Sequence, residues 1–130
     1  MYHRDYIIRM IQQFIVFIAE LAGLKKKDDP EVILMRLEGA YQQFTGMKSE
    51  VVRSLSAEGI VSLFSATGEV DYNRILVTAI LLREEAAALR SIRDPASESL
   101  SRKADRLISH IKGNEAKLYD ELKSWMMENG

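Results

Sequence analysis

Two amphipathic helical patterns, separated by a short turn, occupy residues 75–111, which read ILVTAILLREEAAALRSIRDPASESLSRKADRLISHI. In the first pattern, apolar residues recur every three or four positions, at Ile75, Ala79, Leu82, Ala86 and Leu89. The second pattern has the same period, at Ala96, Leu100, Ala104, Leu107, Ile108 and Ile111. This spacing places apolar side chains on one face of an α-helix. Because the turn at Arg93-Asp94-Pro95 is short, the stretch predicts an antiparallel helical hairpin.

The composition of the first arm indicates how the hairpin is oriented. Small side chains at residues 86–88 allow a neighbouring helix to approach closely. The charged residues of this arm are expected to stay near water, at Arg83, Glu84, Glu85 and Arg90. The adjacent pair Glu84 and Glu85 is not a catalytic pair, since consecutive helical residues point in different directions.

Upstream of the hairpin, residues 6–24 form a long helical pattern with two adjacent apolar stripes. One stripe contains Tyr6, Met10, Phe14, Phe17, Leu21 and Leu24, and the other contains Ile7, Ile11, Ile15, Ile18 and Ala22. A helix with so wide an apolar face is expected to be central to the fold or buried against a second copy. Gly23 is expected to end it as a C-terminal cap, followed by three lysines where the helix dipole favours cations.

Further helix boundaries lie between these two regions. Asp29-Pro30 predicts the start of a helix over residues 31–44, because Asp accepts hydrogen bonds from free amides and Pro suits the first helical position. Gly46 closes this helix. Residues 47–68 predict two short helices, the second capped by Ser56. Asp71 is the expected cap of the first hairpin arm.

These patterns predict an all-α helical bundle of about five to seven helices. The chain has 130 residues, which is the size of one domain. We divide this domain, residues 1–130, into N-terminal helices over residues 1–68 and a hairpin with a capping helix over residues 69–130. The capping helix is predicted from Leu118, Leu122 and Trp125.

Composition excludes several classes of protein. The chain contains no Cys, which rules out disulfides, thiolate metal sites and thiol catalysis and fits a cytoplasmic protein. A formal net charge of −1 argues against a nonspecific nucleic-acid binder. The N-terminal apolar pattern is interrupted by Arg9 and Glu20, so it predicts a helix of the mature protein rather than a membrane span or signal peptide.

The opening Met1-Tyr2-His3-Arg4-Asp5-Tyr6-Ile7-Ile8-Arg9-Met10-Ile11, an aromatic-rich helix and Gly23-Leu24 resemble a family of small uncharacterised proteins from Gram-positive bacteria, classed as a domain of unknown function. The resemblance covers essentially the whole chain. It implies tetratricopeptide-like helical hairpins in the second half, where Ser97 and Ala104 lie near two of the repeat's small-residue positions. It implies no activity.

No motif for catalysis, metal binding or cofactor binding is found. The two histidines, His3 and His110, lie in different elements, and neither is spaced from a second ligand as zinc or di-iron sites require. Phosphate-binding loops, nucleophile elbows and dinucleotide fingerprints are absent. We therefore predict no metal, no cofactor and no enzymatic activity. A small enzyme using the His3-Arg4-Asp5 cluster is the least favoured alternative.

The function predicted from the sequence is protein or peptide interaction, because stacked helix pairs leave grooves that accept a segment of a partner. The possible partner contacts are Arg83, Glu84, Arg90 and Arg93. Self-association is a second hypothesis, carried by Tyr6, Met10, Phe14, Phe17 and Leu21. The alternative is a peripheral membrane protein, with residues 25–27 as lysines for anionic headgroups. Residues Trp125-Met126-Met127 could add an adaptable surface but are expected to be mostly core.

Overall fold

The computed structural model describes residues 2–111 and residue 120, with side chains described from residue 5 onward. Among these residues it contains six α-helices and no β-strand, which confirms the predicted all-α bundle. In chain order the helices are α1 (Tyr2–Lys26), α2 (Pro30–Thr45), α3 (Ser49–Ser54), α4 (Ala57–Leu63), α5 (Tyr72–Ser91) and α6 (Ala96–Ile111). The predicted capping helix at residues 118–126 lies outside the described residues, apart from residue 120.

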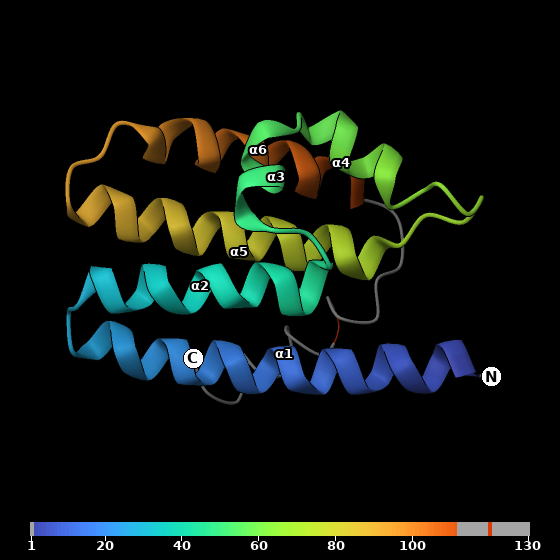
Figure 1. Cartoon of the computed structure of the whole chain (residues 1–130), viewed down its shortest axis with the longest axis horizontal. Coiled ribbons are helices and arrows are strands. Elements are labelled where there is room, and N and C mark those ends of the chain that lie inside the picture. The colour runs from blue at the N-terminus through green and yellow to red at the C-terminus, as the bar shows by residue number, and fades with distance from the viewer. Residues whose placement is uncertain (1, 112–119, 121–130) are drawn as a thin grey trace.

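The four long helices lie side by side in the order α1, α2, α5, α6, and each runs opposite to the one before it (Figure 1). α5 and α6 form the predicted antiparallel hairpin, and α5 also packs against α2. The short helices α3 and α4 lie on one side of this row, where α3 contacts α2 and α4 contacts α6. The chain between α2 and α5 therefore crosses over to reach the outer helix of the hairpin.

α5 is the central helix of the bundle, because it packs between α2 and α6. Its buried residues are Ile75, Leu76, Val77, Thr78, Ala79, Leu81, Leu82, Glu85, Ala86 and Ala88. The prediction that Glu85 stays near water is wrong, since this residue is 3% exposed. Glu85 follows Leu82 by three residues and precedes Leu89 by four, so it lies on the face that packs inward.

α1 lies at the edge of the row (Figure 1), so the expectation that it is central to the fold is wrong, while burial against a second copy stays a prediction. Its buried apolar residues are Met10, Ile11, Phe14 and Leu21. The ring of Phe14 packs edge-on against Phe44 of α2, with centroids 5.1 Å apart, and Phe17 lies 5.7 Å from the same ring. The exposed face of α1 carries the polar side chains of Arg9, Gln12, Gln13 and Glu20 together with Val16, which is 58% exposed.

Among the described residues, α1 is the one helix long and apolar enough to cross a membrane, judged by length and composition. In this structure, 22% of its apolar window is buried inside the protein. Four of its apolar side chains, Met10, Ile11, Phe14 and Leu21, are buried, so the helix forms an outer layer of the bundle.

Local chemistry at the helix ends matches most of the predicted boundaries. The side chains of Asp29, Ser56 and Asp71 accept hydrogen bonds from the free backbone amides of α2, α4 and α5, respectively. Gly46 ends α2 with φ of 76°, the left-handed conformation that glycine adopts without strain. The prediction for Gly23 is wrong, because α1 continues to Lys26 and turns at Asp28, where φ is 54°.

Candidate functional site

The candidate functional site is a groove with a volume of about 680 Å³ between α2 and α6, with α5 as its floor. We call it the α2–α6 groove. Its lining residues are Leu34, Met35, Glu38, Arg53, Glu85, Leu89, Asp94, Ala96, Ser99, Leu100 and Lys103. The volume lies in the range of roughly 300–1,000 Å³ that is typical of ligand-binding pockets. The groove stands out because three long helices build it and a buried charged residue lies in its floor.

The short helix α3 closes one end of this groove. Its Val52 is fully buried, and the backbone oxygens of Val52 and Arg53 accept hydrogen bonds from Lys103 of α6, at 3.1 and 2.7 Å from its Nζ atom. On the opposite wall, Ser49 donates a hydrogen bond to the carboxylate of Glu38 in α2. α3 is thus held between the same two helices that form the walls of the groove.

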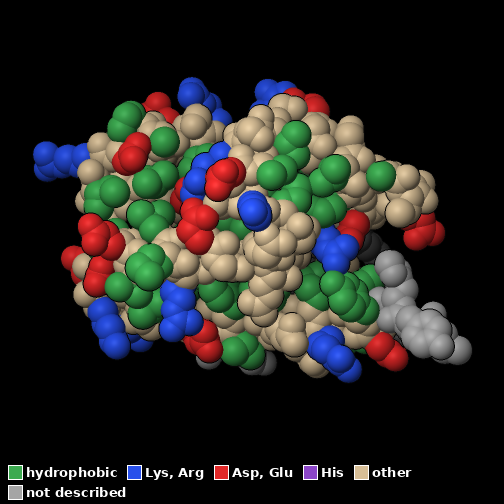
Figure 2. Space-filling view, viewed as in Figure 1, with side chains coloured by type: hydrophobic (Ala, Val, Ile, Leu, Met, Phe, Trp, Pro, Cys, Tyr) green, Lys and Arg blue, Asp and Glu red, His purple; other side chains and the backbone are tan. Residues whose placement is uncertain are grey.

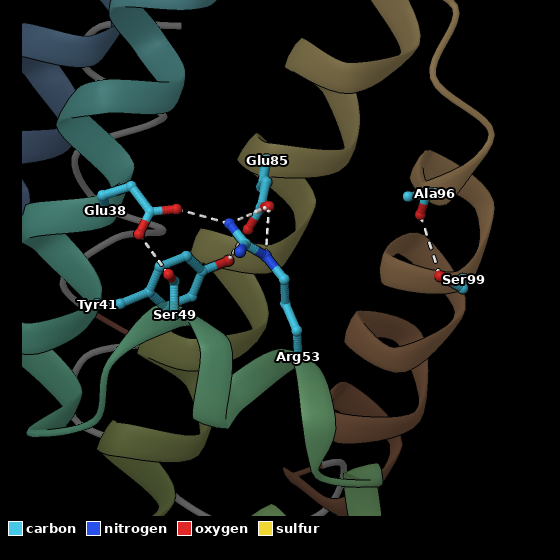
Figure 3. Close-up of polar contacts among 7 residues, drawn as sticks. All are labelled: Glu38, Tyr41, Ser49, Arg53, Glu85, Ala96 and Ser99. Carbon is cyan, nitrogen blue, oxygen red and sulfur yellow. Dashed lines mark hydrogen bonds and ion pairs between the residues drawn. The ribbon is translucent and has the colours of Figure 1, made fainter.

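The polar end of the groove is a cluster formed by Glu38, Tyr41, Ser49, Arg53 and Glu85, which Figure 3 shows with the side chains pointing toward one another. Arg53 Nε donates to Glu85 Oε2 at 2.8 Å, and Arg53 Nη2 donates to Glu38 Oε1 at 2.7 Å. The hydroxyl of Tyr41 donates to Glu85 Oε1 at 2.7 Å. We call these five residues the Glu85 cluster. It connects α2, α3 and α5.

Burial and hydrogen bonding shift several pKa values within the Glu85 cluster. Burial raises the pKa of Tyr41 well above its ordinary value, and the negative charge of Glu85 adds to this effect, so the phenol remains a donor. The hydrogen bond from Ser49 and the interaction with Arg53 outweigh burial and hold the pKa of Glu38 below its ordinary value. Burial alone would lower the pKa of Arg53, but its two carboxylate partners raise it.

Lys103 is the second cation of the groove, and its surroundings differ from those of Arg53. Burial lowers its pKa, and the negative charge of Glu85 opposes this shift. Its Nζ atom donates to two carbonyl oxygens at the end of α3, where the helix dipole favours a positive charge. Lys103 therefore acts as a C-terminal cap for a helix from which it is separated by about 50 residues.

The other end of the groove is apolar and open. Leu34, Leu89 and Leu100 line it, and Met35 on its rim is 76% exposed. In the space-filling view, hydrophobic side chains gather on this face beside a mixed group of acidic and basic side chains (Figure 2). An exposed apolar wall next to charged groups is typical of surfaces that bind a partner.

The predicted partner-binding residues do not converge on this groove, or on one another. Arg83 pairs with Asp105 of α6 at 2.9 Å, and Glu84 pairs with Lys25 of α1. Arg90 lies two helical turns beyond Arg83 on the same side of α5. Arg93 lies in the turn to α6, where its φ is 60°. Glu84 thus faces α1 while Arg83 faces α6, and a role of these four residues in binding a partner stays a prediction.

The residues predicted for self-association are also divided by the structure. Met10, Phe14 and Leu21 are buried within the chain, so the prediction that they contact a second copy is wrong. Phe17 is partly buried against the core. Tyr6 is 56% exposed, and its hydroxyl accepts a hydrogen bond from Arg74 Nη2 at 2.8 Å. The guanidinium of Arg74 also lies over the Tyr6 ring.

Sequence reasoning did not identify the residues that shape the groove, Arg53, Glu85 and Lys103. One signal was available for Glu85, since an acidic residue within the apolar stripe of Leu82 and Leu89 must find a buried partner. Its partners, Tyr41 and Arg53, lie on other helices and share no local pattern with it. They could therefore be found only once the packing of the helices was known.

The groove contains no arrangement that indicates catalysis or metal binding. Within the described residues, no group of three or more metal-ligating side chains is present. The polar atoms of Tyr41, Glu85 and Arg53 are engaged with one another, which fixes their positions. His110 lies outside the groove, with its Nε2 atom 3.7 Å from Glu58. The side chain of His3 lies outside the described ones.

Two further hollows occur on the described surface. One, of about 600 Å³, follows α1 and α2 and is lined by amide and apolar side chains, among them Gln12, Gln43 and Phe17. The other, of about 340 Å³, lies around the start of α5, near Tyr72. Neither contains a buried charged side chain. Comparison of the chain with family models, curated proteins and solved structures gives no match.

Proposed function

We propose that this protein is an interaction module that binds a segment of another protein in the α2–α6 groove. The observation that carries the proposal is that α3 already occupies one end of the space between α2 and α6. The neighbouring length of the same space is open and has an apolar wall. A surface that accepts a helical segment of its own chain has the shape to accept a similar segment from a partner.

The energetics of the groove favour binding over chemistry. Leu34, Leu89 and Leu100 offer apolar surface, whose removal from water contributes roughly 25 cal/mol per Å². The Glu85 cluster holds the polar end of the groove in one shape. The groove therefore loses little conformational freedom when a partner binds. A rigid wall with a few fixed polar groups gives both affinity and orientation.

Site-specific photocrosslinking tests this proposal. A photoreactive amino acid is placed at Ser99, which lines the groove, or at Glu98, which is exposed on a different side of α6. In lysate of the native host, we expect one defined protein to be crosslinked from position 99 and not from position 98. Loss of that product when Ala96→Trp fills the groove is the second expected result. Equal products from both positions would refute the proposal.

A peripheral membrane role is the second candidate, because α1 is long and apolar enough to cross a membrane and exposed lysines occupy its C-terminal end at residues 25–27. Against this role, the exposed face of α1 carries Arg9, Gln12, Gln13 and Glu20, although Tyr6 and Val16 are also exposed on this helix. Liposome flotation with anionic vesicles distinguishes the two functions. Binding that disappears when the three lysines are replaced by Gln would support the membrane role.

A further inference from the structure

We infer that the partner segment is a helix that carries a basic side chain one turn away from an apolar side chain. This inference rests on the proposed function and specifies the chemistry of the partner. It follows from three observations: the net charge of the groove, the spacing of its apolar and acidic side chains along α2, and the contacts by which α3 is bound beside it.

The first observation concerns charge. The lining contains the acidic residues Glu38, Glu85 and Asp94 and the basic residues Arg53 and Lys103, so acids exceed bases by one. Both cations are already engaged, Arg53 with two carboxylates and Lys103 with two carbonyl oxygens. The carboxylates are engaged as well: Glu85 accepts from Tyr41 and Arg53, Glu38 accepts from Ser49 and Arg53, and Asp94 accepts from the backbone amide of Ala96. The groove therefore offers a partner one net negative charge and the remaining lone pairs of these oxygens.

Glu38 is the acceptor best placed to meet a partner. Its side chain is 53% exposed, whereas that of Glu85 is 3% exposed. Each Glu38 oxygen accepts one hydrogen bond, from Ser49 or from Arg53. A carboxylate has about four lone-pair positions, so Glu38 retains capacity for a further donor from the solvent side. A Lys or Arg side chain is the donor that matches its charge.

The second observation concerns spacing. Leu34 and Glu38 lie four residues apart in α2, which places them one turn apart on the same face, about 6 Å along the axis. A partner helix that lies along α2 meets both residues with side chains that are three or four positions apart. The apolar side chain contacts Leu34, Leu89 and Leu100, and the basic side chain contacts Glu38.

The third observation is the example that α3 itself provides. This helix buries Val52 completely and extends Arg53 between Glu38 and Glu85. It thus combines one apolar and one basic contact on the same two walls. The open part of the groove continues along the same two walls, with Leu34 one turn along α2 from Glu38, the acidic residue that Arg53 already contacts.

Selection from a displayed library of helical peptides, randomised on one face, tests the inference. The full chain is used as bait, with Ser99→Trp as the variant that fills the groove and Glu98→Trp as the control on another side of α6. We expect enriched peptides to bind the original chain and Glu98→Trp but not Ser99→Trp. Their sequences are expected to contain Lys or Arg three or four positions from Leu, Ile, Met or Phe.

Glu38→Gln then tests the role of the charge. We expect this substitution to lower the affinity for these peptides about two- to fivefold, because an exposed ion pair contributes little more than this. Glu98→Gln is expected to leave the affinity unchanged. Thermal unfolding of each variant verifies that the bundle is intact. Affinity is also expected to fall as salt is raised.

Two results would overturn the inference, and they have different meanings. The first result is a set of peptides that depend on the open groove but lack basic residues, or that bind Glu38→Gln with unchanged affinity. This result would refute the inference that the partner is basic and would leave the proposed binding function in place. If no peptide distinguishes Ser99→Trp from Glu98→Trp, the groove is not a binding site, and the proposed function fails together with the inference.

Discussion

Replacing Arg53 with Met tests how strongly the bundle depends on the Glu85 cluster. In the native chain, the Glu85 carboxylate is 3% exposed and is paired with Arg53, whose side chain is 38% exposed. The variant would leave this carboxylate with the Tyr41 hydroxyl as its remaining partner in the cluster. Removing one partner of a fully buried ion pair costs roughly 3–5 kcal/mol. Because water can reach the position of Arg53, we expect the free energy of unfolding to fall by about 2–3 kcal/mol.

Arg83→Met is the matched control for this variant. Arg83 and Asp105 form an ion pair of similar length, 2.9 Å, but their side chains are 54% and 62% exposed. Exposed pairs contribute about 0–1 kcal/mol, so we expect a loss below about 0.5 kcal/mol. Urea unfolding at pH 7, followed by circular dichroism, measures both variants. Equal denaturant slopes are required for the comparison of free energies.

The double variant Arg53→Met with Glu85→Gln completes the test. A neutral amide in place of the carboxylate can still accept the hydrogen bond of Tyr41 but no longer needs a cation. We therefore expect the double variant to be more stable than Arg53→Met alone, with a coupling energy of about 1.5 kcal/mol or more. The reasoning is refuted if Arg53→Met costs no more than Arg83→Met, or if the effects of the two substitutions simply add.

Three further predictions concern α2, Tyr41 and Lys103. Gly39→Ala is expected to stabilise the chain by about 0.5–1 kcal/mol, because Gly39 lies inside α2 where an added methyl group would meet open space. Gly46→Ala is expected to destabilise it by about 1 kcal/mol, because φ at Gly46 is 76°. Thermal unfolding of both variants shows whether each substitution raises or lowers the stability of the chain. Because the pKa of Tyr41 is raised in the folded state, the unfolded state releases a proton above pH 10 that the folded state retains. The contribution of this group to the free energy of unfolding is therefore complete below pH 10 and falls by about 1.4 kcal/mol per pH unit above it. Tyr41→Phe should remove this part of the alkaline slope in urea titrations, and an unchanged slope would contradict the assignment. Lys103→Met is expected to cost about 1 kcal/mol and to speed amide hydrogen exchange in α3 more than in α2, since it removes two hydrogen bonds to the end of α3.

Helix starts were the most predictable part of the structure. Asp29, Ser56 and Asp71 each bond to an amide three residues later, so the interaction is contained within a few residues of sequence. Gly46 was predictable for the same reason. Gly23 was misassigned because glycine also occurs inside helices, at a cost of about 1 kcal/mol relative to alanine, and α1 continues through it to Lys26.

The groove was not predictable, since it depends on contacts between residues far apart in the chain. Arg53 is separated from Glu85 by 32 residues, and Lys103 from Arg53 by 50. Charged residues on helices are most often solvated, so sequence reasoning placed Glu85 in water together with Arg83 and Glu84. Which of these residues is buried depends on the side from which α2 approaches α5, and no local pattern encodes that approach.

The dependence of α3 on its neighbours has a consequence for the order of folding. This helix has six residues, whereas isolated helices shorter than about 12–15 residues are marginal in water. Its stabilising contacts come from α2, α5 and α6, so we expect α3 to become helical after those three have assembled. We therefore expect the wall at the closed end of the groove to form after α2, α5 and α6 have packed together.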